Sequence, residues 1–591
     1  MIGRPPRSTQ KRVAQSTTLE LSAAMRTLLG SRSDRRLAGL RPSVSVEGLI
    51  AIASLFFVAT ANGAFWSGVR DAGILDQPGS WRLLASMGLA IAGLHAILLG
   101  IVLNRWTAKP LLTLLLMATA AAAYFADRYA VHYDPSMIRN VLRTDTAEAS
   151  ELLTPGLASS VLAMGVLPAA LLWWTRIRTY GWKRSLLRRL AFLLAVTALT
   201  GVALAACFDD LSSLMRNHKS LRYLVTPGNY LVSTVKVLGE DARTADAPRR
   251  IVGEDARLVG HESSTKPHLL VIVVGETVRA QNWGLNGYRR QTTPQLSSLD
   301  VINFTDVTAC GSNTEVSVPC MFSVAGRRKY DQELIRRSES LLHVLERAGV
   351  RTLWRDNQTG CKGVCAGLAF ESYREPRIDP LCDEQACRDA VMLQGLHDAI
   401  DDNPGDAVVV LHQLGNHGPS YFKRYPPSLR RFIPDCRSSD LGRCSQEEIV
   451  NAYDNAILET DDFLARTIRM LAQDRSHDTA MIYLSDHGES LGEGNLYLHG
   501  FPYAIAPQTQ IKVPMVAWLS PGMRDSAGID MRCFERQAGR PLSHDNLFHS
   551  VLGLMQVRSS AYDAALDVFS ACAGVSMPQA SRMGFVRRQE R

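Results

Sequence analysis

The chain has 591 residues, a net charge of +8 and a mean hydropathy near zero. This length exceeds that of one ordinary domain. The average hydropathy would suit a soluble protein, but apolar residues are concentrated in the first third, which excludes an evenly polar, single-domain chain.

The first third contains apolar runs of membrane-spanning length. Each is near the ~20 residues that a helix needs to cross ~30 Å of hydrocarbon. A buried core helix is an alternative for the third and shortest run, but five in succession favour a transmembrane domain over residues 46–208. The five runs are 49–69, 83–103, 110–126, 157–175 and 190–208.

Basic residues between these runs predict their orientation. Residues 1–45 hold nine Lys and Arg, and the second and fourth connections are more basic than the first and third. The positive-inside rule then places the 1–45 tail in the cytoplasm and everything after residue 208 outside. The triplet ATA at 59–61 resembles a signal-peptidase site, but its basic lead is too long and the apolar run continues past it.

The cysteines point to the same compartment. Ten of the eleven lie after residue 300, and Cys207 lies in the apolar third. Metal-binding cysteines usually come as CxxC pairs, whereas an even number with differing, mostly small spacings favours disulfides and an oxidising compartment. The expected pairs are Cys310 with Cys320, Cys361 with Cys365, Cys382 with Cys387, Cys436 with Cys444, and Cys533 with Cys572.

Residues 209–266 form a connector between the apolar third and the cysteine-rich part. The connector mixes apolar and basic residues, which suits helices lying at a membrane surface, and it ends in a polar linker. We expect a catalytic domain over residues 267–575 and a basic tail over 576–591.

Strand and helix patterns alternate in the catalytic domain. Apolar runs of strand length occur at 268–275, 350–357, 406–415, 479–488 and 513–520, with helical patterns at 340–349 and 445–473. The longer helix opens with Ser445 and Glu448, a capping-box spacing. The alternation predicts an α/β fold with a largely parallel central sheet, in which ligands bind beyond the carboxyl ends of the strands.

Acids and histidines follow these strands. Glu276 follows the first strand, His417 a later one, and Asp486 and His487 another, with His499 twelve positions further on. Two carboxylates and an imidazole form an open ligand set for a catalytic divalent metal, although any one of them could be a solvated loop charge.

Thr314 lies inside the small loop between Cys310 and Cys320. Its hydroxyl could be the fourth ligand, and a metal would make it more acidic and a better nucleophile. The disulfide would hold the hydroxyl in place. The alternative is a structural disulfide with Thr314 as a capping residue.

Four long motifs resemble the lipid A phosphoethanolamine transferases, which include the mobile colistin-resistance enzymes and belong to the alkaline phosphatase/sulfatase superfamily. The motifs are VVGETVRAQNWGLNGYRRQTTPQL, CGSNTEVSVPCMFS, HQLGNHGPSYFKRYP and SDHGESLGEGNLYLHGFPYAIAP. The resemblance covers most of the chain. It implies five transmembrane helices before an alkaline-phosphatase-like catalytic domain in the periplasm.

The resemblance also implies roles for individual residues. The zinc ligands would be Glu276, Thr314, Asp486 and His487, with Thr314 the nucleophile and His417 and His499 beside the transferred phosphate. One zinc ion is implied and a second, held by the two histidines, is left open. WRDNQTGCKG places Thr359 and Lys362 at the phosphoethanolamine.

A further segment, MIRNVLRTDTAEASELL, matches donor-binding positions at Asn140, Thr144 and Glu148. Their i, i+4, i+8 spacing predicts one face of one helix. The sequence also departs from the family at Glu315, where related loops often carry a small residue. This carboxylate could tune the metal or repel an anionic acceptor.

The implied reaction moves phosphoethanolamine from phosphatidylethanolamine to a lipid A phosphate through a covalent intermediate on Thr314. The added ammonium would weaken the binding of polymyxins and cationic peptides to the outer membrane. The resemblance further implies a monomeric, multi-pass inner-membrane protein with no nucleic-acid partner.

Four alternatives remain at this stage. A phosphoglycerol transferase shares the superfamily, and a core sugar or a protein could replace lipid A as acceptor. A sulfatase is disfavoured because the C-x-P-x-R motif lacks its arginine here. A membrane-anchored metal sensor could use the same ligands but would need no nucleophile.

Overall fold

The computed structural model describes residues 41–73, 80–244, 248–259, 266–374, 380–382, 386–401 and 405–573. The predicted C-terminal tail and most of the predicted N-terminal tail lie outside these residues. The chain divides into two compact units. One comprises Met1–Asn62, Arg70–Ala122 and Ser159–Leu214, and the other Gly63–Val69, Ala123–Ala158 and Met215–Arg591.

The first unit is helical. Helices α5 (Ser80–Val102), α6 (Ala108–Tyr129) and α11 (Trp182–Ala206), and the helical stretch Pro155–Trp174, are long and apolar enough to cross a membrane. The first apolar run is a bent pair, α3 (Val46–Thr60) and α4 (Gly63–Asp71), which makes a fifth span if it is counted as one, although most of α4 is assigned to the second unit. The predicted helical membrane region is therefore confirmed, with four spans or five.

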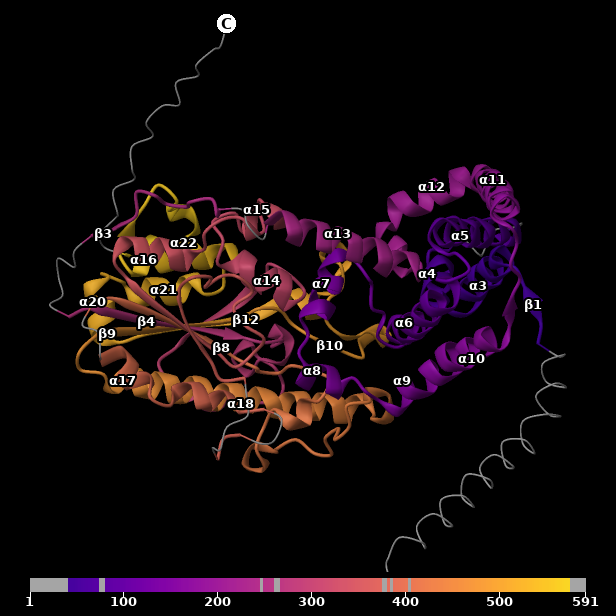
Figure 1. Ribbon diagram of the computed structural model, residues 1–591. Coiled ribbons are helices and arrows are strands. Elements are labelled where there is room, and N and C mark those ends of the chain that lie inside the picture. Colours follow the sequence, from indigo (N-terminus) through magenta and orange to yellow (C-terminus); the bar gives the residue numbers. More distant parts are fainter. Residues whose placement is uncertain are drawn as a thin grey trace, which may run out of the picture. The chain divides into compact units, whose positions relative to one another are not determined.

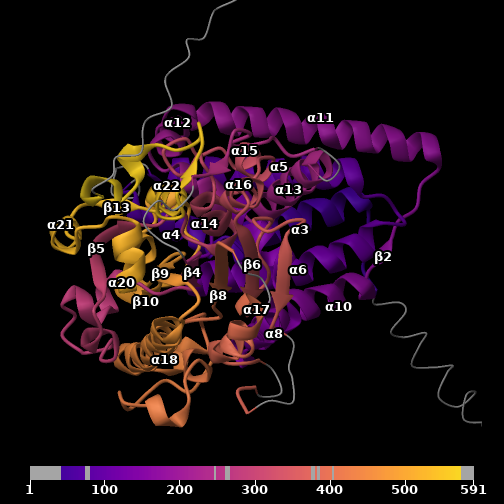
Figure 2. The same cartoon turned by 90° about the vertical axis from the view of Figure 1, so that its left-hand side faces the viewer.

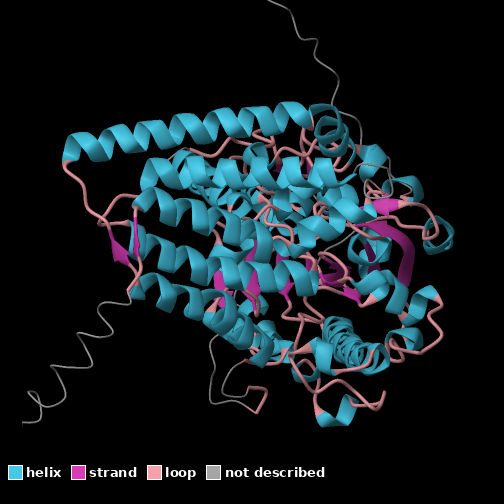
Figure 3. Ribbon diagram, turned by 90° about the vertical axis from the view of Figure 1, so that its right-hand side faces the viewer, coloured by secondary structure: helices cyan, strands magenta, loops and turns pink. Residues whose placement is uncertain are grey.

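Close helix packing in this unit depends on small residues. Helix α5 packs against both α3 and α11, and Figure 3 shows long helices running side by side. A Cβ atom added to Gly93 of α5 would stand 1.9 Å from Thr200 Oγ1 of α11. Gly93 thus permits the approach of two backbones that is typical of membrane helices.

The second unit is built around an eight-stranded sheet, in the order β13-β5-β12-β9-β4-β8-β6-β7. The strands are β4 (His268–Gly275), β5 (Ile302–Thr308), β6 (Arg351–Asp356), β7 (Ala369–Ser372), β8 (Ala407–His412), β9 (Asp478–Ser485), β12 (Lys512–Leu519) and β13 (Leu542–Ser543). The run from β9 to β7 is parallel, and β12 pairs antiparallel with both neighbours. Figure 2 shows β5, β4 and β6 in this order across the sheet.

Two apolar cores cover the two faces of the sheet. In β4, Leu270 and Ile272 face one core, which includes α16 (Leu341–Ala348) and α22 (Asp545–Leu554), while Val271 faces another, which includes α18 (Gln446–Gln473). Figure 1 shows α18 on one side of the strands and α16 and α22 on the other. Burial of both faces explains why β4 is a continuous apolar run rather than an alternating one.

The predicted α/β fold is confirmed. Every strand expected from an apolar run is present, and Ser445 and Glu448 form the predicted capping box of α18. The sequence patterns missed β5, β7 and β13. Strand β5 mixes polar and apolar residues, and the other two are only four and two residues long.

The segment that carries the expected donor-binding residues is two helices, which corrects the prediction of a single helical face. Helix α7 (Pro135–Arg143) ends before Thr144, whose ψ of 129° is extended, and α8 (Thr146–Glu151) starts after Asp145. Asp145 accepts a hydrogen bond from the Glu148 N–H, and this N-cap starts the new helix. Both helices belong to the second unit.

The connector is also helical. It forms α12 (Phe208–Asn217), a 3₁₀ turn and α13 (Gly228–Thr244). Its placement at a membrane surface stays a prediction, as do the domain boundaries.

All five expected cysteine pairs are joined in the second unit, with Cα atoms 3.9 to 6.0 Å apart. Cys207, the cysteine of the apolar third, is a buried free thiol.

Candidate active site

The site forms where adjacent parallel strands end. Gly275 at the end of β4 pairs with Ser485 at the end of β9. Glu276 and Asp486, the next residues, therefore leave the sheet at equivalent positions. Both side chains are fully buried, as is that of His487.

Two backbone N–H groups hold the Asp486 carboxylate, and one of them belongs to Thr277, whose backbone conformation is uncommon. Asp486 Oδ1 accepts hydrogen bonds from the N–H groups of His487 at 2.7 Å and Thr277 at 3.2 Å. Thr277 has a φ of +56°, which is costly for a β-branched residue. The Tyr453 hydroxyl donates to the Thr277 carbonyl at 2.6 Å and helps to hold this conformation.

Thr314 is the first residue of helix α14 (Thr314–Met321), and Asn313 caps the helix by accepting from the Val316 N–H. The Thr314 hydroxyl donates to Glu276 Oε2 at 3.0 Å and lies 3.2 Å from His487 Nε2. The structure thus brings together four predicted ligands from three separate segments.

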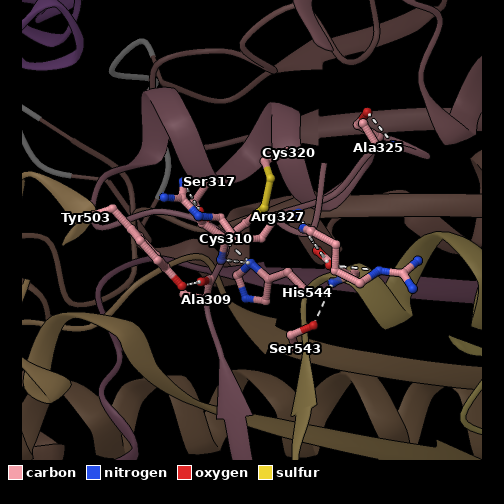
Figure 4. The surroundings of a disulfide bond; sticks show 12 residues. Ala309, Cys310, Ser317, Cys320, Ala325, Arg327, Tyr503, Ser543 and His544 are labelled. Carbon is pink, nitrogen blue, oxygen red and sulfur yellow. Dashed lines mark hydrogen bonds and ion pairs between the residues drawn. A yellow bond between two sulfur atoms is a disulfide. The ribbon is translucent and has the colours of Figure 1, made fainter. Parts of the chain in front are cut away.

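The disulfide ties α14 to the segment that precedes it, because Cys320 lies in the helix and Cys310 lies four residues before Thr314. Figure 4 shows Cys310 and Cys320 joined, with His544 beside them. His544 Nδ1 accepts from the Cys310 N–H at 3.1 Å, and the Tyr503 hydroxyl donates to the Ala309 carbonyl at 3.0 Å. These contacts limit the freedom of the loop that carries Thr314.

Unsatisfied buried oxygens show that the ligand set fits a metal. Among the residues that the structure describes, Glu276 Oε1 and Asp486 Oδ2 are buried without a hydrogen-bond partner. They lie 3.4 and 3.3 Å from His487 Nε2. Such oxygens are costly unless a cation meets them. Glu276, His487 and His499 also offer ligand atoms within 4.8 Å of one another, so His499 adds a donor beyond the predicted four.

The protonation states fit the same interpretation. Burial raises the pKa of Asp486 to about 6, with the charge of Glu276 adding to the effect. Burial alone would lower the pKa of His487, but Asp486 and Glu276 outweigh it and raise that pKa to about 10. A proton on His487 therefore compensates carboxylates that a metal ion could neutralise instead.

His417 and His499 both lie beside this cluster. Their ring centroids are 5.8 Å apart, and His499 lies 4.3 Å from His487 by the same measure. His417 Nε2 is 3.2 Å from Glu148 Oε1, while His499 Nδ1 is 3.2 Å from Glu489 Oε2. Burial disfavours a charged His417, but Glu148 outweighs this and raises its pKa.

The segment after β6 brings Thr359 and Lys362 to the site. Lys362 Nζ contacts Thr359 Oγ1 and lies 3.3 Å from Glu315 Oε1. Gln358, which sequence reasoning missed, donates from Nε2 to Glu276 Oε2 at 3.1 Å. Glu489 was missed as well, although it follows His487 by only two positions in the SDHGES motif.

The three expected donor-binding residues are Asn140 in α7, Thr144 between the helices and Glu148 in α8, and Glu148 contacts a site histidine. The Thr144 hydroxyl donates instead to the Asn140 carbonyl at 3.0 Å. The role of Asn140 and Thr144 stays a prediction.

Three cations surround Glu315, so its carboxylate does not stand as a free negative charge that would repel an anionic acceptor. Its carboxylate lies 2.9 Å from Arg143, 3.0 Å from Arg336 and 3.3 Å from Lys362, and its side chain is fully buried. The carboxylate therefore faces away from the acidic cluster, toward a basic region.

The phosphoethanolamine transferase EptA of Escherichia coli is 37% identical to this chain over 540 residues, which is 91% of the chain and 98% of the relative. The chain belongs to the phosphoethanolamine transferase family. The phosphatidylethanolamine transferase Mcr-1 of Escherichia coli is 39% identical over 492 residues, 81% of this transferase and 90% of the relative.

Family models and a solved structure agree. Residues 268–557 match the sulfatase family and residues 91–242 the phosphoethanolamine transferase EptA/EptB family. The integral membrane lipooligosaccharide phosphoethanolamine transferase A of Neisseria meningitidis has a TM-score of 0.84 and 34% identity, covering 90% of this transferase and 99% of that chain. The family, the fold and the class of enzyme expected from the sequence are thereby confirmed.

Proposed function

We propose that this transferase moves phosphoethanolamine from phosphatidylethanolamine to a phosphate of lipid A through a covalent adduct on Thr314. The position of the Thr314 hydroxyl carries the proposal: it lies at the start of a helix and within 3.2 Å of both Glu276 and His487. The names of the relatives support the donor, the transferred group and a lipooligosaccharide acceptor.

The residues that would hold zinc are Glu276, Thr314, Asp486 and His487, whose oxygen, nitrogen and hydroxyl donors suit this ion. His499 and His417 could complete a second site. When bound, zinc supplies positive charge that makes the threonine hydroxyl more acidic and offsets the negative charge of the phosphoryl oxygens.

In the first half-reaction Thr314 Oγ1 attacks the donor phosphorus. The Glu276 carboxylate accepts the hydroxyl hydrogen bond and takes the hydroxyl proton as the oxygen attacks. The new bond joins Oγ1 to phosphorus, and the bond to the diacylglycerol oxygen breaks. That oxygen needs a proton as it leaves, which His417 can donate because Glu148 favours its protonated form.

In the second half-reaction a lipid A phosphate oxygen attacks the same phosphorus. The bond to Thr314 breaks, Oγ1 takes its proton back from Glu276, and the proton of the attacking phosphate returns to His417. The N-terminal end of α14 directs its positive dipole end toward the phosphoryl group in both steps.

The donor headgroup has a phosphate and an ammonium, and the site offers a partner for each. Lys362 and Thr359 would bind the phosphate. Glu148 offers its carboxylate to the ammonium, with Asn140 and Thr144 on the segment leading to it.

We also propose a monomer in the inner membrane with its catalytic unit in the periplasm. Apolar helices of spanning length, five disulfides and the integral membrane relative support this location. The modified lipid A would carry an extra ammonium and bind polymyxins more weakly.

Mass spectrometry of lipid A from cells with and without the gene tests the proposal. A phosphoethanolamine increment that depends on the gene supports it. A phosphoglycerol increment, or modification of a core sugar or a protein alone, would replace the proposed donor or acceptor.

A further inference from the structure

A cavity of about 640 Å³ in the second unit is lined by cations that the mechanism above does not fully use. Five basic side chains contribute to its wall, namely Arg143, Arg249, Arg336, Arg337 and Lys362. We infer that this basic cavity is the subsite that binds a phosphate of the acceptor. The inference rests on the proposed transfer function and extends it to the second substrate.

The basic cavity lies beside the helix that carries the nucleophile. Pro319 of α14 and Ser323, two residues after the helix ends, line the cavity. Glu315 precedes Pro319 by four residues, a spacing that places both on one face of α14. The cavity therefore adjoins the helix face that carries Glu315, the residue after Thr314.

Glu315 anchors the cations at the inner end of the basic cavity. Its carboxylate joins Arg143, Arg336 and Lys362, three residues from three separate segments. Arg143 also lies 3.8 Å from Asp241, so these three cations face two carboxylates and the cluster keeps a positive excess. Arg336 Nε is also buried without a hydrogen-bond partner among the described residues.

The other acids of the wall already have partners. Asp241 lies 3.2 Å from Arg139, and Glu339 pairs with Arg347. Burial lowers the pKa of Arg249, and burial together with neighbouring arginines lowers that of Arg336. An anion in the basic cavity would relieve both effects.

The residues proposed to bind the donor lie together outside the basic cavity. Glu148, Gln358 and His417 surround a space of only about 10 Å³, room for about one water, and Thr359 lines both this space and the basic cavity. The two groups of residues thus meet at the segment that carries Thr359 and Lys362. Of the two spaces, the basic cavity alone has room for a phosphorylated sugar.

The chemistry of the wall identifies the ligand class. Guanidinium groups bind phosphate oxygens through paired hydrogen bonds, and phosphomonoesters carry more charge than the diester of the donor. The volume falls in the range of pockets that hold ligands larger than one phosphate. A phosphomonoester on a sugar fits, as in a phosphorylated glycolipid, and free inorganic phosphate shares the chemistry.

The test compares two double variants of the full-length transferase in detergent. In Arg249→Gln with Arg337→Gln, two cations of the basic cavity are lost, while the contacts of Glu315 remain. The control is Arg437→Gln with Arg466→Gln, which removes two exposed arginines that have ion-pair partners elsewhere. Arg466, like Arg337, pairs with an acid four residues away.

Transfer rates are measured against the concentration of diphosphorylated lipid A, and diacylglycerol release is measured without acceptor. We expect the acceptor KM to rise at least about tenfold in the cavity variant, the effect of losing one charge-assisted contact. Diacylglycerol release and donor KM should be unchanged, and the control should match the unsubstituted enzyme. Inorganic phosphate should compete with lipid A, more weakly in the cavity variant, and dephosphorylated lipid A should not bind.

Three results would overturn the inference. The first is an unchanged acceptor KM, and the second is a rise in donor KM instead, which would assign the cations to the donor. The third is competition by phosphate that the substitutions do not alter. If the unsubstituted enzyme transfers without an adduct on Thr314, the proposed covalent route fails, while the acceptor KM still decides the role of the basic cavity.

Discussion

The two sides of Thr314 surround buried carboxylates with different numbers of cations. On one side, Glu276 Oε1 and Asp486 Oδ2 are buried without a hydrogen-bond partner among the described residues, and one histidine, His487, lies 3.4 and 3.3 Å from them. On the other, Glu315 Oε1 also lacks a hydrogen bond, but three cations lie within 3.3 Å of this one carboxylate. Buried carboxylates thus indicate different functions depending on their partners: two carboxylates beside one histidine indicate a cation site, and an excess of cations indicates an anion site.

Removing the hydroxyl between the two sides should have the largest effect. Thr314→Ala should reduce transfer at least about 10³-fold, because the other hydroxyl of α14, that of Ser317, donates to the Asp486 carbonyl instead. Thr314→Ser should keep measurable activity, since it retains the oxygen but loses the methyl that restricts its rotamers. Mass spectrometry should find phosphoethanolamine on Thr314 when donor is supplied without acceptor. Normal lipid A modification by the alanine variant would show that Thr314 is only a cap.

The second largest effect should be a loss of zinc from the side of Thr314 that carries Glu276 and Asp486. Asp486→Asn together with His487→Ala should lower the zinc content of the purified enzyme at least about tenfold, because two of the proposed ligands are gone. Asp306→Asn, which changes an acid of β5 that pairs with Lys512, is the matched control. Elemental analysis measures both, and an unchanged zinc content in the double variant would refute the ligand assignment.

The stability of the metal-free enzyme should differ between the two sides. Glu315→Gln should reduce the free energy of unfolding by about 3–5 kcal/mol, since it leaves buried cations without their carboxylate. Glu276→Gln should reduce it by less, because relief of the repulsion with Asp486 partly offsets the weaker contact with His487. Denaturant titration of both variants after chelation measures the difference. Equal losses of unfolding free energy in the two variants would contradict the proposed difference between the two sides.

The disulfide between Cys310 and Cys320 should affect stability less than Glu315 does, and it should affect both sides of Thr314. Replacing Cys310 and Cys320 together by serine should reduce the free energy of unfolding by about 2–4 kcal/mol. Transfer should fall less than in Thr314→Ala because the hydroxyl is still present. The same double replacement at Cys436 and Cys444 is the control for stability alone, and equal losses of transfer in both variants would mean that the first disulfide does not position Thr314.

Most of the fold could be predicted because its signals are local. An apolar run such as that of β4, buried on both faces, is visible without knowledge of its neighbours. The capping box of α18 depends on two residues three positions apart. In contrast, β13 is two residues long and exists only because β5 offers an edge to pair with.

The residues of the site likewise fall into those that local sequence predicts and those that only the folded structure brings together. Glu276 and Asp486 could be found because each directly follows a strand. The partners of Glu315 could not, because Arg143, Arg336 and Lys362 come together only in the folded unit. The helix break at Thr144 was missed because Asp145 outweighs the helical spacing by capping a new helix.

The spacing of the disulfides has a consequence for biosynthesis. In four of the five pairs the partners are ten or fewer residues apart along the chain. Both cysteines of such a pair reach an oxidising compartment almost together during N-to-C-terminal synthesis, and short loops close at little entropic cost. Each pair can therefore form before a competing cysteine arrives, so the nascent chain should need little help from a disulfide isomerase.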